Sequence, residues 1–278
     1  MERILRGIMR YRVLDRSSMV KQFQQVKDNP VVRLTLYTTL KIMILESLLF
    51  RFFTTPKAVF YTCMDSRMIP TRFTETSVGD MFVVRNAGNL IPHSQHFVDE
   101  MTSCEPAALE LGCIINDIRH IIVCGHSDCK AMNLLYKLKS KEESNTEQRR
   151  MSPLRSWLCN HGQTSLDKFI AMDGDFSKPM LFTAETPQTK FVAYIDPENK
   201  FSTEDKLSQV NTLQQLQNIA SYGMLKSRLQ KHDLHIHALW FDIFTGDIYY
   251  FSRRAKTFVV IDESTYETIL AEVRRYYS

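Results

Sequence analysis

Short apolar runs are the most regular feature of the hydrophobic pattern along this chain. Three early runs are rich in Val, Ile and Phe and apolar on both faces, which is typical of strands buried in a parallel sheet. They lie at residues 57–63, 81–85 and 120–125. Between the second and third runs, hydrophobic positions follow helical spacing, so residues 102–118 predict a helix. The resulting strand–helix–strand unit predicts a parallel sheet with right-handed crossovers.

The second half of the chain repeats this alternation with longer helical segments. Three late apolar runs predict further strands, of which at least one pair is antiparallel. We therefore expect an α/β fold: a central, mainly parallel β-sheet with an antiparallel edge strand, flanking helices and an N-terminal helical arm. The predicted later helices cover residues 129–138, 153–172, 203–230 and 264–277, and the late strands cover residues 234–241, 248–252 and 257–261.

Composition narrows the class of protein without naming a function. The chain has 278 residues, 44% hydrophobic and 24% charged, as in ordinary globular proteins. A dispersed net charge of +4 argues against a nucleic-acid partner. Six cysteines in a chain of this length do not suggest a disulfide framework, so a reducing compartment is expected.

The first residues leave two compartments open. They do not lead into the apolar core of a secretory signal peptide, so an intracellular location is expected. Four arginines within residues 3–12 are interleaved with apolar residues, as in a mitochondrial transit peptide, although Glu2 and Asp15 count against that reading. The alternative is an ordinary amphipathic helix. Both the cytoplasm and the mitochondrial matrix stay open.

Two cysteines and a histidine stand at the ends of predicted strands. Cys63 ends the first run, and His126 and Cys129 follow the third. The carboxyl ends of parallel strands meet at one edge of a sheet, so these side chains can converge. Two thiolates and an imidazole form a zinc-type ligand set, and three protein ligands with one open position are typical of a catalytic zinc site. The alternative is that they are buried residues that never meet a metal.

Two charged residues follow the first cysteine closely. Asp65 and Arg67 can place a carboxylate and a guanidinium beside the open position. An ionised Asp65 can orient a zinc-bound hydroxide, while Arg67 holds Asp65 as a bidentate pair. A purely structural ion pair is the alternative. His235 and His237 share one face of a strand, but ordinary packing or surface positions are favoured because no third ligand stands nearby in the sequence.

The pattern Cys-x-Asp-Ser-Arg at residues 63–67, followed by His-x-x-Cys at residues 126–129, resembles the β-class carbonic anhydrases, especially the animal members. Further matching segments lie at residues 79–89, 107–112, 210–213 and 238–246. The resemblance implies reversible hydration of carbon dioxide to bicarbonate and a proton by a zinc-bound hydroxide. It implies one Zn²⁺ per subunit, with Cys63, His126 and Cys129 as ligands, Asp65 and Arg67 as the catalytic dyad, and Asp65 as an occasional fourth ligand in a resting form.

The resemblance also carries expectations about assembly and the substrate pocket. It implies a homodimer or higher homo-oligomer, with the pocket at the subunit interface and N-terminal helices wrapped around the partner. Asn86, Gly88 and Gly125 are expected to line that pocket. Two other functions stay open: the same zinc site acting on a related small linear molecule such as carbon disulfide, and a non-catalytic protein stabilised by zinc.

One segment departs from the family pattern. Relatives run from the N-terminal helices almost directly into the first strand, whereas here an apolar insertion intervenes at residues 31–53. Its 23 residues could span a membrane, but four charged residues interrupt it, and no membrane association is expected. An added amphipathic helix stays open, and we favour an error in the gene model. The expected organisation is an arm over residues 1–55 and a catalytic domain over residues 56–278.

Overall fold

The computed structural model describes residues 56–97, 103–140, 152–183 and 190–277. By their contacts, these residues fall into two compact units. The larger unit contains Ala58–Ile69 and the chain from Val83 onward, and the smaller contains Pro56, Lys57 and Pro70–Phe82. The expected N-terminal arm and its insertion at residues 31–53 lie outside the described residues.

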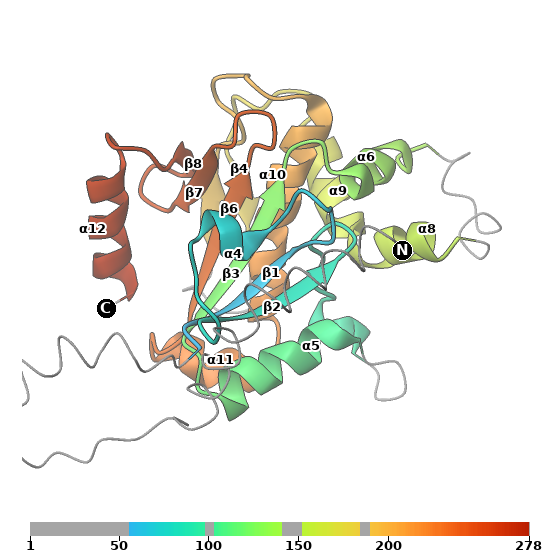
Figure 1. The fold of residues 1–278 in the computed structure, drawn as a ribbon. Helices are drawn as coiled ribbons and strands as arrows, with labels where there is room; N and C mark the ends of the chain where they lie inside the picture. The colour runs from blue at the N-terminus through green and yellow to red at the C-terminus, as the bar shows by residue number, and fades with distance from the viewer. Residues whose placement is uncertain (1–55, 98–102, 141–151, 184–189, 278) are drawn as a thin grey trace, which may run out of the picture. The chain divides into compact units, whose positions relative to one another are not determined.

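A six-stranded sheet organises the larger unit, in the order β2-β1-β3-β6-β7-β8 (Figure 1). Strand β1 pairs in parallel with β3 and β3 with β6, whereas the β6–β7 and β7–β8 pairs are antiparallel. The predicted mainly parallel sheet is thus confirmed, with two antiparallel strand pairs at one edge. The strands are β1 Ala58–Cys63, β2 Met81–Asn86, β3 His120–His126, β6 His235–Phe241, β7 Ile248–Ser252 and β8 Thr257–Val260.

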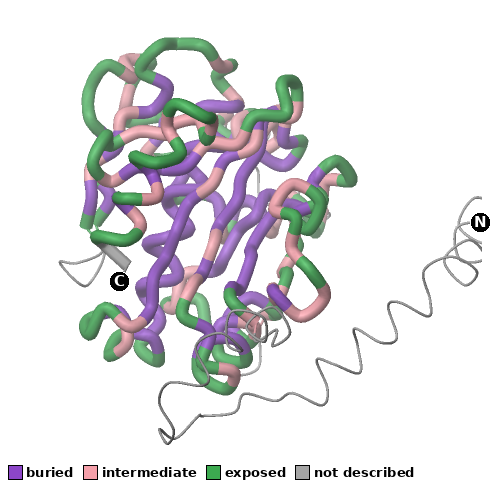
Figure 2. The backbone as a smooth tube through the Cα atoms, turned by 60° about the vertical axis from the view of Figure 1, so that its left-hand side comes forward, coloured by how far each residue is buried: buried purple, intermediate pink, exposed green. Residues whose placement is uncertain are grey.

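The three central strands form the core because their side chains are apolar on both faces. Every residue of β1 is buried, as are most residues of β3 and β6 (Figure 2). The register places Val59 of β1 opposite Ile121 of β3, and Ile121 opposite Ile236 of β6. Neighbouring β-branched side chains therefore continue the apolar layer across the sheet.

Helices pack against this core and connect its parallel strands. The long helix α10 (Thr203–Ala220) packs along β3 and β6, and begins where the Ser202 hydroxyl accepts from the Asp205 amide. The connection from β2 to β3 contains α5 (Cys104–Leu109), which continues into a π-helical turn at Glu110–Ile115 against β1. The remaining helices in the larger unit are α6 Lys130–Lys137, α8 Pro153–His161, α9 Gln163–Ile170, α11 Gly223–Gln230 and α12 Tyr266–Tyr277, with a short 3₁₀ turn at Ser94–His96.

The structure differs from the predicted elements in three places. The helix predicted over residues 153–172 breaks at Gly162 into α8 and α9, and the one over residues 203–230 breaks into α10 and α11. Two unpredicted three-residue strands, β4 (Met180–Phe182) and β5 (Phe191–Ala193), form a separate antiparallel pair. Within the described parts of the chain, no helix is long and apolar enough to cross a membrane.

The smaller unit is described separately. It contains one turn of helix, α4 (Pro70–Phe73), and the start of β2. Asp80 organises the segment between them, because its carboxylate accepts from the Ser77 amide at 2.8 Å and pairs with Lys57 at 3.2 Å.

Candidate metal centre

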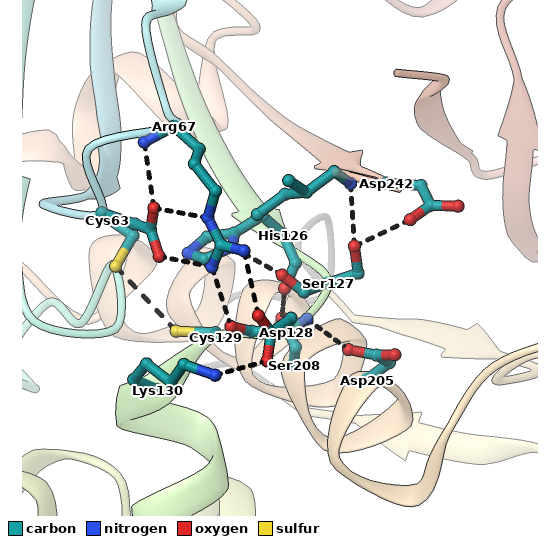
Figure 3. Close-up of polar contacts among 12 residues, drawn as sticks. Cys63, Arg67, His126, Ser127, Asp128, Cys129, Lys130, Asp205, Ser208 and Asp242 are labelled. Carbon is teal, nitrogen blue, oxygen red and sulfur yellow. Dashed lines mark hydrogen bonds and ion pairs between the residues drawn. The ribbon is translucent and has the colours of Figure 1, made fainter. Parts of the chain in front are cut away.

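The three predicted ligands converge where two parallel strands end. Cys63 is the last residue of β1, His126 is the last residue of β3, and Cys129 is the N-cap residue of α6. Their ligand atoms lie within 4.8 Å of one another, and all three side chains are buried (Figure 3). No other group of three or more potential ligands meets this geometry in the described ranges. Strand topology alone accounts for the meeting, since β1 and β3 are neighbours in the sheet.

The donor atoms fit a zinc ion. His126 Nδ1 donates to the Ser127 carbonyl at 2.8 Å, which leaves the lone pair on Nε2. That Nε2 atom is buried and has no hydrogen-bond partner among the described residues. The sulfur atoms of Cys63 and Cys129 lie 3.9 Å apart, close to the separation of about 3.8 Å that a tetrahedral Zn²⁺ with bonds of about 2.3 Å to sulfur requires. An imidazole lone pair and two thiols thus face the same point.

The surroundings of the two thiols favour one thiolate even before a metal binds. The hydrogen bond from the Cys129 thiol lowers the pKa of Cys63, against the opposing effect of burial, and the neighbouring His126 imidazole and the amides of Gly88 and Asp65 lower it further. The pKa of Cys129 is raised, chiefly because its proton is the one shared with Cys63 and because the thiol is buried. A cation that replaces this proton allows both sulfurs to ionise.

Asp65 and Arg67 form the bidentate pair that the sequence predicts. The Arg67 side chain donates from Nε to Asp65 Oδ1 at 2.9 Å and from Nη2 to Oδ2 at 2.7 Å, and its backbone amide donates to Oδ1 at 3.0 Å. These hydrogen bonds hold the pKa of Asp65 well below its usual range. Asp65 is therefore a carboxylate that accepts hydrogen bonds at any physiological pH.

Sequence reasoning missed two further charged residues at this site. Asp128 accepts from Arg67 Nη1 at 2.9 Å, on the edge of the guanidinium that Asp65 leaves uncovered. Arg85, in β2, donates to the carbonyl oxygens of Cys63 at 3.1 Å and Asp65 at 2.7 Å, which fixes the loop between them. Both residues stand inside the quoted family motifs, but only the strand pairing shows which groups they reach.

Helix α10 supports the turn that carries His126. Ser208 donates to the His126 carbonyl at 2.7 Å and accepts from the Trp240 indole at 3.1 Å. The next residue, Ser127, donates to the buried Asp242 at 2.8 Å and accepts from the Ile243 amide. Such outer contacts orient metal ligands and restrict their motion.

Comparison with known proteins identifies the family. The sequence model of a family described as carbonic anhydrase matches residues 58–248. The chain is 44% identical to beta carbonic anhydrase 1 of Caenorhabditis elegans, over all of this chain and 94% of that protein. It is 43% identical to beta carbonic anhydrase 1 of Caenorhabditis briggsae, over 99% of this chain and 93% of that protein. This chain belongs to the β-carbonic anhydrase family.

A solved β-carbonic anhydrase has a similar fold. The structure of the β-carbonic anhydrase CcaA is 26% identical and superposes with a TM-score of 0.66, over 94% of this chain and 99% of that chain. A tetrameric β-carbonic anhydrase from Sordaria macrospora, 16% identical with a TM-score of 0.51, shares the fold. The resemblance inferred from the sequence motifs and the predicted fold class are therefore confirmed.

The expected pocket residues of this β-carbonic anhydrase occupy three different environments. Asn86 holds the turn after β2: its side chain donates to Leu90 O and Glu105 and accepts from the Leu90 amide. Gly88 has a φ of +84° and directs its amide at the Cys63 sulfur. Gly125 packs on α10, where a Cβ atom would lie 2.0 Å from Thr212 Oγ1. Contact with substrate stays a prediction for all three.

Proposed function

We propose that this β-carbonic anhydrase carries out the reversible, zinc-dependent hydration of carbon dioxide to bicarbonate and a proton. One observation supports the proposal above all: two thiols and an unpartnered imidazole lone pair converge at the same strand ends as an ionised Asp–Arg pair. A binding protein that used zinc only for stability would need neither a vacant fourth position nor a charged pair beside it. The activity named for the nematode relatives agrees with the proposal.

Cys63, His126 and Cys129 would hold the zinc ion. When bound, the ion lowers the pKa of water and so supplies a nucleophile near neutral pH. The ligand set has a formal charge of zero with the ion, since two thiolates balance its charge and His126 binds as a neutral imidazole. The Ser127 carbonyl fixes the tautomer, because it can only accept the proton on Nδ1 and so leaves the Nε2 lone pair for the ion.

The Asp–Arg pair would orient the nucleophile. Because Asp65 stays ionised, it can only accept a hydrogen bond, and so selects a water or hydroxide whose proton faces the carboxylate. The remaining lone pair then faces the electrophile. Arg67 engages both Asp65 oxygens, which keeps the carboxylate in one orientation and away from a direct bond to the ion. In a separate resting form, in which the carboxylate has left Arg67, Asp65 would occasionally ligate zinc.

We propose that the active form is a homodimer or a higher homo-oligomer. Three apolar side chains on the π-helical turn after α5 are exposed in the isolated chain: Leu111, Ile114 and Ile115. Val83 of β2, the strand at one end of the sheet order, is exposed too. Light scattering coupled to gel filtration measures the assembly.

We also propose that the chain resides in the cytoplasm or the mitochondrial matrix. Imaging of the tagged chain in cells tests this location.

Stopped-flow CO₂ hydration, with zinc counted in the same sample, tests the proposed function. We expect rapid hydration with one zinc per chain, loss of activity on chelation, and recovery when one equivalent of zinc returns. A zinc-loaded chain that hydrates CO₂ no faster than buffer would refute the proposal. Carbon disulfide, tested in parallel, would identify a chain whose pocket selects the related substrate.

A further inference from the structure

We propose that Asp128 is a positioning residue: it fixes the Arg67 guanidinium, which in turn fixes the Asp65 carboxylate at the metal centre. The inference rests on the proposed function, because it assigns a role within the same site. It adds a second carboxylate to the Asp65–Arg67 pair. The three groups come from the two segments that follow β1 and β3, and all three metal ligands lie at the ends of these segments.

The hydrogen bonds of Arg67 show how one carboxylate controls the other. A guanidinium has five N–H donors in a rigid plane. Two edges of the Arg67 guanidinium are occupied. On one edge, Nε and Nη2 donate to the Asp65 carboxylate. On the other edge, Nη1 donates to the Asp128 carboxylate at 2.9 Å and Nη2 donates to the Asp128 carbonyl at 3.2 Å. Because the plane is rigid, an Asp128 contact on one edge sets the direction of the edge that Asp65 uses.

Asp128 is itself firmly placed. Its backbone has a φ of +49°, a left-handed conformation that aspartate tolerates better than most residues. Its amide donates to the carboxylate of Asp205 at 2.7 Å, and Asp205 is buried in the first turn of α10. A continuous set of contacts therefore runs from Asp205 of α10 through Asp128 to Arg67 (Figure 3), and Arg67 in turn holds Asp65.

Lys130 provides a contrast at the same carboxylate. Its amino group contacts the other Asp128 oxygen at 2.8 Å, but the Lys130 side chain is 75% exposed, against 24% for Asp128. Exposed ion pairs of this kind contribute little, since solvent screens them and the lysine loses side-chain entropy. Removing Lys130 should therefore leave Arg67 in place, which makes Lys130→Ala a matched control.

Asp128→Gly is the sharpest variant. Glycine adopts the positive φ without strain and keeps the amide and carbonyl contacts, so only the carboxylate is lost. We expect kcat/KM for CO₂ hydration to fall about tenfold or more, as for other groups that orient a metal site. The kcat/KM of Asp128→Asn, which keeps an acceptor oxygen, should lie between those of Asp128→Gly and the wild type. The zinc content and the melting temperature of Asp128→Gly should match those of Lys130→Ala.

A double-mutant cycle distinguishes positioning from general support of the fold. If Asp128 acts through Asp65, adding Asp128→Gly to the Asp65→Asn variant should lower kcat/KM by a further factor of less than about two. If the two residues act independently, the two reductions in kcat/KM would multiply. The visible absorption of the cobalt-substituted proteins gives a second readout. We expect the spectrum to change in Asp128→Gly, to stay unchanged in Lys130→Ala, and not to change further in the double variant.

Three results would overturn the inference. The first is that Asp128→Gly has the kinetics and the cobalt spectrum of the wild type. The second is that the reductions in kcat/KM multiply in the double-mutant cycle. The third is that lost zinc or a lower melting temperature accounts for the reduced activity of Asp128→Gly. An inactive wild-type protein would refute the proposed function instead. The cobalt spectra would still decide whether Asp128 positions the pair.

Discussion

The two ends of strand β3 carry similar side chains and differ in what those side chains do. One end finishes at His126, beside Cys63 and Cys129. The other begins at His120, which lies beside two histidines of β6, His235 and His237. Both are clusters of residue types that bind metals, and only the first brings its ligand atoms together within the described residues.

The histidine cluster at the start of β3 interacts mainly with itself. His120 Nδ1 and His237 Nε2 share a hydrogen bond of 3.1 Å, and the rings of His235 and His237 each lie 5.3 Å from that of His120. Burial lowers the pKa of all three, to about 4 for His235 and about 3 for His237. These imidazoles are therefore neutral at neutral pH, and those of His120 and His237 are already hydrogen-bonded to each other.

The contrast shows that a metal site depends on converging lone pairs more than on residue type. At the end of β3, a backbone carbonyl directs His126 so that Nε2 faces two sulfurs, and amides surround those sulfurs. At the start of β3, the ring nitrogens of His120 and His237 face each other. Of the two expected environments for His235 and His237, their burial agrees with ordinary packing and not with surface positions, and the expectation overlooked His120.

The largest expected effect separates the two clusters by activity. Cys63→Ser should reduce CO₂ hydration by more than about a hundredfold, because a serine hydroxyl cannot replace a thiolate ligand. His120→Ala, at the opposite end of the sheet, should keep most of the wild-type rate. Stopped-flow assays at equal protein concentration measure both. Full activity in Cys63→Ser would remove that residue from the site.

A smaller effect is expected for the group beside the ligands. Asp65→Asn should keep its zinc but lower kcat/KM by roughly ten- to a hundredfold, because the amide can present a donor where an acceptor is needed. Zinc content is measured in Asp65→Asn and in Cys63→Ser, so that the activity lost with the metal can be separated from the activity lost while the metal stays bound. An Asp65→Asn protein with the wild-type rate would leave the pair with only a structural role.

The third effect belongs to the histidine cluster and concerns stability. The pKa of His237 is about 3 in the folded chain and about 6.5 when unfolded. Between these values the unfolded chain binds more protons, so stability falls as the pH drops from about 6.5 toward about 3. One such histidine costs about 2 kcal/mol between pH 7 and pH 5.

His237→Gln should remove its own share of the pH dependence, about 2 kcal/mol, while His235 keeps a similar share, as measured by urea unfolding at pH 7 and pH 5. The matched control is His96→Gln, since His96 is exposed and outside the cluster. The control should retain the wild-type pH dependence. Equal pH dependence in His237→Gln and the wild type would show that the cluster already accepts protons in the folded state.

The sequence predicted the metal centre better than its surroundings. Cys63 and His126 were predictable because each lies at the end of a hydrophobic run, and the pairing of parallel strands brings such ends together; Cys129 follows His126 by three residues. Asp65 and Arg67 were predictable as near neighbours in the chain. Asp128 was not, since its contact with Arg67 depends on a positive φ and on Asp205, 77 residues away.

The errors in the fold prediction also have physical causes. Hydrophobic spacing continues across Gly162, so periodicity alone did not divide α8 from α9. Strands β4 and β5 have only three residues each, too few for a pattern to emerge. His120 was overlooked because its partners lie 115 and 117 residues away, and only the β3–β6 register brings them together.

Zinc counting by mass spectrometry in wild-type chain, Cys129→Ser and the double variant His120→Ala/His237→Ala tests the central claim most directly. We expect one zinc per chain in the wild type and in the double histidine variant, and almost none in Cys129→Ser. Zinc retained by Cys129→Ser, or lost from the histidine variant while it remains folded, would contradict the assignment of the metal centre.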